Sequence, residues 1–122
     1  MSNSDFEKVI EAEQIKTLIM AAGTETVQAI LDAFWDSNEE ILEALTTHLG
    51  NENLEEASKS AHALKGSAAN LGATMLSDRA RQIETACKEN DSATAKETFL
   101  SVEADMEASR VAFEALMKAA AA

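Results

Sequence analysis

Three residues of one predicted helix, His62, Lys65 and Gly66, have types and spacing that could do chemistry. At about 100° per residue, His62 lies roughly 130° from the centre of that helix's apolar seam, so its side chain is expected to point to solvent. Lys65 and Gly66 lie one turn further along the same side. An imidazole with an ordinary pKa of about 6.5 is largely neutral, and therefore nucleophilic, at neutral pH. The patch predicts a surface nucleophile beside a cation.

Gly66 is the most informative of the three, because a glycine inside a helix costs about 0.8–1.0 kcal/mol relative to alanine. The missing side chain would clear space above the imidazole of His62 for a phosphoryl group and for the backbone of a partner. The alternative is a packing glycine at a close crossing of two helices. A single surface histidine is also usually inert, so the spacing alone leaves both interpretations open.

The charge distribution favours an anionic ligand near His62. The whole chain of 122 residues has a formal net charge of −12, yet residues 59–88 hold five of its ten cations against two acidic residues, a local balance of +3. A bound group of about −2 charge would be stabilised there. The alternative is that three of these cations only solvate the outer face of a helix. The five cations are Lys59, Lys65, Arg79, Arg81 and Lys88.

Helix formers dominate the chain, which has no proline and four glycines, so we expect an all-α protein. Gly23, Gly50 and Gly72 separate helical segments, and Thr24 and Asn53 are suited to cap the segments that follow. The predicted helices cover about residues 9–22, 25–49, 54–71, 74–90 and 92–119.

Apolar residues of the third segment follow a 3-4-3-4-3 spacing from Leu54 to Leu71, which is typical of a bundle seam. Helices joined by short loops return antiparallel. We therefore predict an antiparallel up-down four-helix bundle with an additional short N-terminal helix laid across one end. A single domain should span residues 1–122, with a core of about 9–118 and flexible tails at 1–8 and 119–122.

Composition also excludes several function classes. Nucleic acid and membranes are poor partners for so acidic a chain, because phosphate backbones and anionic lipids would repel it. The single cysteine, Cys87, cannot form an internal disulfide, and no Cys/His group has zinc spacing. The polar N-terminus lacks the features of a signal peptide, and no apolar run approaches a membrane span. We expect a soluble, cytoplasmic monomer that binds other proteins.

The segment around His62 resembles the histidine-containing phosphotransfer (HPt) domain. Residues 61–72 read AHALKGSAANLG and are followed by Leu76 and by Ile83 and Glu84, and the likeness extends over about residues 9–118. The resemblance implies a stand-alone phosphotransfer protein of a two-component phosphorelay, which shuttles a phosphoryl group between the aspartates of receiver domains. Those domains, including the receivers of hybrid histidine kinases, would be its partners.

The resemblance also implies roles for five residues. His62 would be the phosphoacceptor, Lys65 would stabilise the charge of the transferring phosphoryl group, and Gly66 would keep the approach open. Ser67 and Glu84 would have hydrogen-bonding or tuning roles. Mg²⁺ and the acceptor carboxylates would belong to the receiver, so this chain would need no metal or cofactor of its own.

Other interpretations remain at this point. The chain could be a helical protein–protein adaptor whose His62 patch is incidental. An enzyme is disfavoured, because no Gly-rich nucleotide loop is present and autophosphorylation from ATP should be absent. His48, the other histidine, lies in a last helical turn that favours a cation and has no Lys-Gly companion. Trp35 and the apolar residues 18–20 would belong either to the core or to a docking surface.

Overall fold

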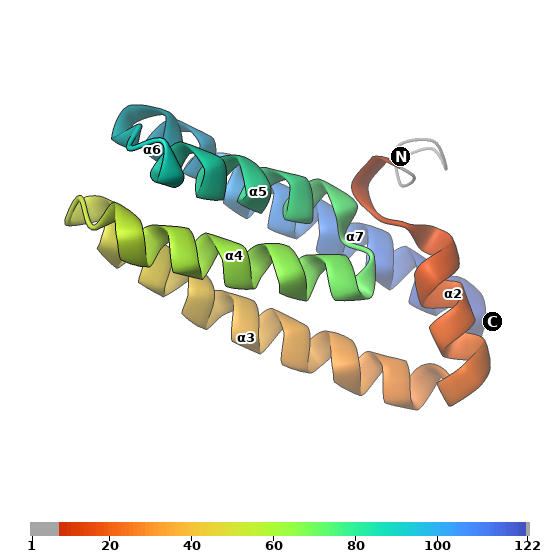
Figure 1. Ribbon diagram of the computed structural model, residues 1–122. Helices are drawn as coiled ribbons and strands as arrows, with labels where there is room; N and C mark the ends of the chain where they lie inside the picture. The colour runs from red at the N-terminus through yellow and green to blue at the C-terminus, as the bar shows by residue number, and fades with distance from the viewer. Residues whose placement is uncertain (1–7, 122) are drawn as a thin grey trace.

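The computed structural model describes residues 8–121, and every element in that range is an α-helix (Figure 1). The prediction of an all-α fold is therefore confirmed. The helices are α2 (Ala12–Ala22), α3 (Thr24–Gly50), α4 (Leu54–Leu71), α5 (Thr74–Lys88), α6 (Ser92–Phe99) and α7 (Val102–Ala121).

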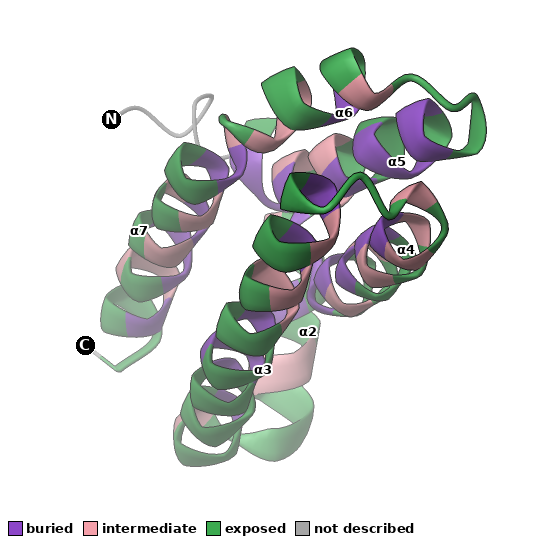
Figure 2. Cartoon of the chain, turned by 90° about the vertical axis from the view of Figure 1, so that its left-hand side faces the viewer, coloured by how far each residue is buried: buried purple, intermediate pink, exposed green. Residues whose placement is uncertain are grey.

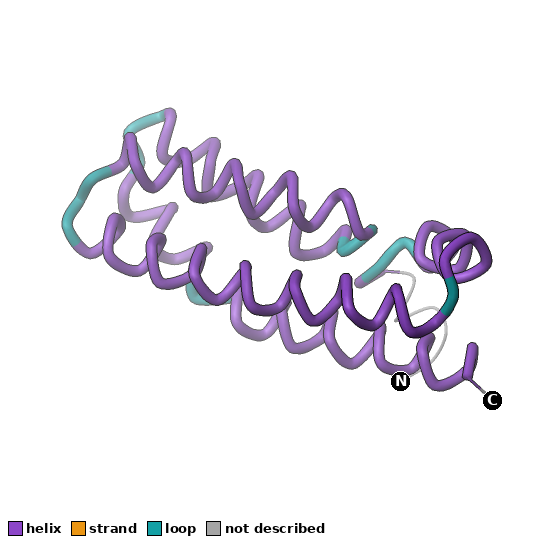
Figure 3. Tube along the Cα trace, turned by 90° about the horizontal axis from the view of Figure 1, so that it is seen from below, coloured by secondary structure: helices purple, strands orange, loops and turns teal. Residues whose placement is uncertain are grey.

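Four long helices form the bundle, and α2 lies across one end of it, as predicted (Figures 1 and 3). Around the bundle, α3 packs against α4, α4 against α5, α5 against α7, and α7 against α3. The seam between α4 and α5 therefore lies on the opposite side of the bundle from the seam between α3 and α7. Short loops make α3, α4 and α5 successively antiparallel, and α6 connects α5 to α7. This arrangement places the candidate site on one outer seam.

The core follows the apolar positions of each helix, and buried residues face the bundle interior in Figure 2. On α4, the fully buried residues are mostly alanines, and small side chains allow α5 to approach closely. Ala86 and Cys87 of α5 are both buried, and on α7 Phe113 is buried whereas Val111 is exposed.

Trp35 belongs to the core rather than to a docking surface. Its indole is buried, and its ring meets Phe34 edge to face, with 4.9 Å between centroids. The ring of Phe113 on α7 lies 6.1 Å away, and the guanidinium of Arg110 lies 4.6 Å from the indole centroid. On α2, Leu18 and Ile19 pack partly against the core, and of residues 18–20 Met20 is the one left almost fully exposed.

The first predicted helix begins later than expected, at Ala12 instead of residue 9. Glu11 has extended backbone angles, and its N–H donates to the carbonyl of Gly72 at 2.6 Å. The amide of Gln14 donates to the carbonyl of Asn70 at 2.7 Å, so this segment is tied to the end of α4 by bonds that no local pattern shows. Gly23, at φ 90°, is the residue before α3, and Thr24 is the first helical residue rather than its cap.

The single helix predicted for residues 92–119 is wrong, because the chain divides it into α6 and α7. At the break, the N–H groups of Leu100 and Ser101 donate to carbonyls only three residues back, which tightens the turn. This turn lets Ala95 and Val102, on either side of it, both be fully buried. Helix α7 also continues to Ala121, so residues 119–121, which were expected to belong to a flexible tail, are helical. Of the other predicted tail residues, Lys8 is described and is helical, and residues 1–7 and 122 lie outside the described residues.

The cap predicted at Asn53 is confirmed. Its side chain accepts a hydrogen bond from the backbone N–H of Glu56 at 3.3 Å, and α4 begins at the next residue. At the other end, Gly72 adopts the left-handed conformation, at φ 79°, and its N–H returns to the last turn of the helix. These two ends set the register of α4 and thereby the direction in which His62 points.

Candidate phosphoryl-transfer site

His62 points out of α4 into solvent, as its helical position predicted. Its side chain is 67 % exposed, while its neighbour Ala61 is fully buried on the inward face. The ring is nevertheless held in place, because Nδ1 lies 2.8 Å from Oε2 of Glu84 on α5. One ring nitrogen is thus engaged by the protein, and the other, Nε2, faces away from that bond.

Glu84 is the central group of the site. Its side chain is only 6 % exposed, and its two oxygens meet three donors from two helices. The ammonium of Lys65 donates to Oε1 at 2.6 Å, and Lys88 Nζ lies 3.1 Å from Oε2, the oxygen that His62 also contacts. We name this group of four residues, His62, Lys65, Glu84 and Lys88, the Glu84 cluster.

The partners of Glu84 keep it ionised. Burial by itself raises the pKa of a carboxyl group, but the hydrogen bonds from Lys65, Lys88 and His62 outweigh it and lower the pKa of Glu84 to about 2. An ionised carboxylate can only accept hydrogen bonds, so the proton of a neutral His62 must lie on Nδ1. Nε2 then carries the lone pair, on the exposed side of the ring.

Gly66 leaves space beside His62 and does not serve a helix crossing. A β-carbon placed on it would meet no neighbouring atom within 4 Å beyond its own helical backbone. The packing interpretation left open by the sequence is therefore wrong. The open surface lies one turn from the imidazole, on the same side of α4.

The hydroxyl of Ser67 has a hydrogen-bond partner other than His62. This hydroxyl lies 3.4 Å from Oδ1 of Asn38 on α3, so it faces the neighbouring helix. Asn38 is fully buried, and its amide also approaches the sulfur of Met106 at 3.9 Å. We did not single out Asn38 from the sequence, although its spacing from Phe34 and Leu45 places it in the apolar register of α3.

The three cations of α5 have different partners. Nε of Arg79 lies 2.6 Å from Oδ2 of Asp105 on α7, and Nη2 of Arg81 lies 2.6 Å from Oδ1 of Asp78 one turn earlier on the same helix. Lys88 alone joins the Glu84 cluster. Its i, i+4 spacing from Glu84 was the signal in the sequence that could have found it.

His48 lies at the end of α3, and no side-chain hydrogen bond of this residue is present among residues 8–121. It is half-buried and has neither a carboxylate that orients its ring nor a lysine one turn away. The arrangement around His62 therefore has no counterpart at His48.

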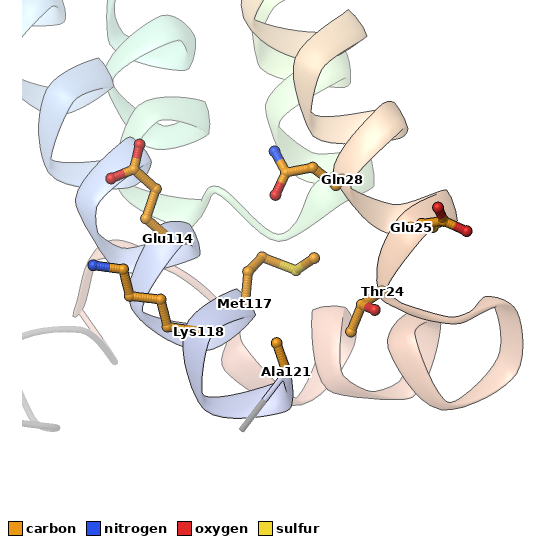
Figure 4. A pocket seen from close by; sticks show the side chains of 7 residues that line it. All are labelled: Thr24, Glu25, Gln28, Glu114, Met117, Lys118 and Ala121. Carbon is orange, nitrogen blue, oxygen red and sulfur yellow. The ribbon is translucent and has the colours of Figure 1, made fainter.

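A hollow of about 250 Å³ borders Lys65 but not His62. Another, of about 440 Å³, opens between the first turns of α3 and the last turns of α7. Its lining residues are seen in Figure 4 and are Thr24, Glu25, Gln28, Glu114, Met117, Lys118 and Ala121. Neither histidine borders it. The candidate site is thus an open surface rather than a pocket, which suits a partner that brings its own binding cavity.

Solved structures show that this fold is that of the histidine-containing phosphotransfer proteins. The chain superimposes on histidine-containing phosphotransfer protein B from Pseudomonas aeruginosa PAO1 with a TM-score of 0.80, at 18 % identity, covering 89 % of this chain and 95 % of that one. With ZmHP2, a histidine-containing phosphotransfer protein from maize, the TM-score is also 0.80, at 20 % identity, covering 92 % and 85 %.

The sequence itself defines the family. Residues 29–120 match the Hpt domain, and the chain is 34 % identical over 82 residues to the phosphorelay protein LuxU of Vibrio harveyi, covering 67 % of this chain and 72 % of LuxU. The chain therefore belongs to the Hpt domain family and is a histidine phosphotransfer protein of a phosphorelay. No helix within residues 8–121 is both long and apolar enough to cross a bilayer.

Proposed function

We propose that this chain carries a phosphoryl group on Nε2 of His62 and exchanges it with the aspartates of response-regulator receiver domains. The observation that carries the proposal is the Nδ1–Glu84 hydrogen bond of 2.8 Å on an exposed ring. It holds the imidazole at a fixed angle and leaves the nucleophilic nitrogen in solvent. LuxU, to which the chain is similar, is named a phosphorelay protein.

The transfer step follows from this geometry. The lone pair of Nε2 attacks phosphorus, an N–P bond forms, and the P–O bond to the receiver aspartate breaks with its electron pair on the leaving carboxylate. Nδ1 keeps its proton, so the ring gains one positive charge while the phosphoryl group brings two negative ones. The carboxylate of Glu84 stabilises that ring charge, and a protonated ring remains a good leaving group for the reverse step.

Lys65 supplies positive charge for the transferring phosphoryl group. In the free protein its ammonium donates to Glu84 at 2.6 Å, and the side chain is 31 % exposed. An ammonium group has three donors, so it can bind a phosphoryl oxygen while it keeps the bond to Glu84. Gly66 adds no side chain on the path by which the receiver approaches.

We further propose that the chain acts as a carrier and not as a kinase. It would take phosphoryl groups from a receiver or pass them on, without ATP, as a monomer whose bundle has its own core. The Mg²⁺ of the reaction would be held by the receiver, because Mg²⁺ sites are built from carboxylates and phosphoryl oxygens, and the Glu84 carboxylate is occupied by three donors.

The test is phosphoryl transfer from a labelled receiver domain to wild type, His62→Gln and His48→Gln. We expect His62→Gln to lose acceptance completely and His48→Gln, the matched control, to keep it. Circular dichroism and the melting temperature should change little in His62→Gln, because the ring is exposed and Glu84 keeps two ammonium partners. Label on His62→Gln, or no transfer to wild type from any of several receivers, would favour an adaptor instead.

A further inference from the structure

Lys88 stands out among the cations of α5 because it shares an acceptor atom with the imidazole. Its Nζ lies 3.1 Å from Oε2 of Glu84, and Nδ1 of His62 lies 2.8 Å from the same oxygen. The two nitrogens are therefore no farther apart than the sum of these two distances. A side chain 26 positions along the chain from His62 is held beside its ring.

We propose that Lys88 is the second phosphoryl-binding cation of the site, kept next to His62 by Glu84. This inference rests on the proposed function and extends it to a residue outside the segment 61–72. Before transfer, the ammonium groups of Lys65 and Lys88 neutralise one carboxylate and leave a surplus of one positive charge. After transfer, the phosphoryl group on Nε2 attracts both ammonium groups.

Lys88 is the cation that can most readily turn towards the phosphoryl group. Its side chain is 65 % exposed, against 31 % for Lys65, so it loses little packing when it moves. Glu84 still has two donors after Lys88 leaves, and no buried charge is left unpaired. The lysine stem is flexible, and its ammonium is a point charge that binds a phosphoryl oxygen from several directions.

The other cations of the α4–α5 hairpin are paired elsewhere. Arg79 bonds to the buried carboxylate of Asp105 on α7, and Arg81 pairs with Asp78 on α5. Lys59 donates to Glu56 at 3.0 Å on α4. The local excess of cations seen in the sequence is thus explained by two lysines at the site and three cations in other ion pairs.

The experiment compares Lys88→Met, which keeps most of the aliphatic stem, with Lys88→Arg, which keeps the charge. Lys118→Met on α7 is the matched control, since it removes the same charge at the opposite seam. Each protein is phosphorylated with phosphoramidate, from which the phosphoryl group passes to Nε2 and ammonia leaves. The rate of phosphohistidine formation and the lifetime of the phosphohistidine are measured, together with the melting temperature.

We expect Lys88→Met to form phosphohistidine about three- to fivefold more slowly, the size typical of an ion pair exposed to solvent. Lys88→Arg and Lys118→Met should stay near the wild-type rate. If wild type and all three variants form phosphohistidine equally fast, or if Arg fails to restore what Met loses, Lys88 is not part of the site. If folded wild type forms none while a control histidine phosphoprotein does, the proposed function fails and this inference with it.

Discussion

The α4–α5 seam and the α3–α7 seam, on opposite sides of the bundle, differ in how closely their helices approach. Helices α4 and α5 meet through small side chains such as Ala61 and Ala80, both fully buried. Helices α3 and α7 are held apart by Trp35 and Phe113, and hollows of about 440 and 200 Å³ lie on either side of that contact. Close backbones let side chains of two helices share one carboxylate, so the Glu84 cluster lies where the packing residues are smallest.

The seams also differ in charge. Helices α3 and α7 together carry ten Asp and Glu against two Lys and Arg, a balance of −8. Helices α4 and α5 carry four against five, a balance of +1. On the proposed function, a phosphorylated, negatively charged partner would be attracted to the α4–α5 side and repelled by the other. The acidic surplus of the chain would then help to select the face that the partner meets.

The largest expected effect is a loss of stability at the α3–α7 seam that leaves phosphoryl transfer unchanged. Phe113→Ala should lower the free energy of unfolding by about 3 to 5 kcal/mol, because the ring is buried and its loss enlarges space that is already loosely filled. Phosphoryl acceptance per folded molecule should not change. Urea unfolding and transfer from a labelled receiver measure the two quantities.

Phe113→Leu is the milder variant to use if Phe113→Ala does not fold. It leaves a smaller void and should cost about 1 kcal/mol. A fall in acceptance that exceeds the loss of folded protein in either variant would show that the two seams are coupled. The assignment of stability to one seam and phosphoryl transfer to the other would then be wrong.

The second prediction concerns acid and the Glu84 cluster. The pKa of Glu84 falls from an ordinary 4.5 to about 2 in the folded protein, so its contribution to stability is complete above about pH 5 and is lost as the pH falls towards 2. Relative to Glu84→Gln, wild type should be more stable at pH 7 by about 2 kcal/mol, after allowance for the exposed partner groups. Melting temperatures of both proteins from pH 7 to pH 2 test this.

Other carboxylates with lowered pKa values, among them Asp78 and Asp91, titrate in both proteins, so the difference between the two melting curves isolates Glu84. The difference should shrink on acidification and be largely lost near pH 2. A difference that stays constant, or grows, would mean that Glu84 is not held ionised by its partners.

Much of the α4 hairpin could be predicted because its signals are local. The 3-4 spacing of apolar residues along α4 set the direction of His62, and the cap at Asn53 and the glycine at position 72 marked the ends. Each of these features depends on a few neighbouring residues in the same helix. The orientation of a helical side chain then follows from geometry alone.

Features that depend on contacts between helices were less predictable. Only the family resemblance placed Glu84 near the site. The periodicity of the helices could not show that Lys88 and His62 share one oxygen of Glu84. The break between α6 and α7 has no glycine or proline, and it follows from burying Ala95 and Val102 on both sides of a turn. Whether Trp35 was core or surface depended on Phe113, 78 positions away.

A small change in stability is expected at Gly66, and the direction of that change is informative. A β-carbon there meets no neighbouring helix, so Gly66→Ala should raise the free energy of unfolding by up to about 1 kcal/mol through helix propensity. Alanine adds one methyl group and should leave acceptance close to wild type, whereas Gly66→Gln places a long side chain beside His62 and should block the receiver. Urea unfolding and receiver transfer on both variants measure these effects.

Because glutamine is also a better helix former than glycine, a Gly66→Gln variant that is more stable and yet inactive would show that the glycine is kept for access at the α4–α5 seam. A loss of stability in Gly66→Ala would instead mean that the backbone at this position depends on glycine.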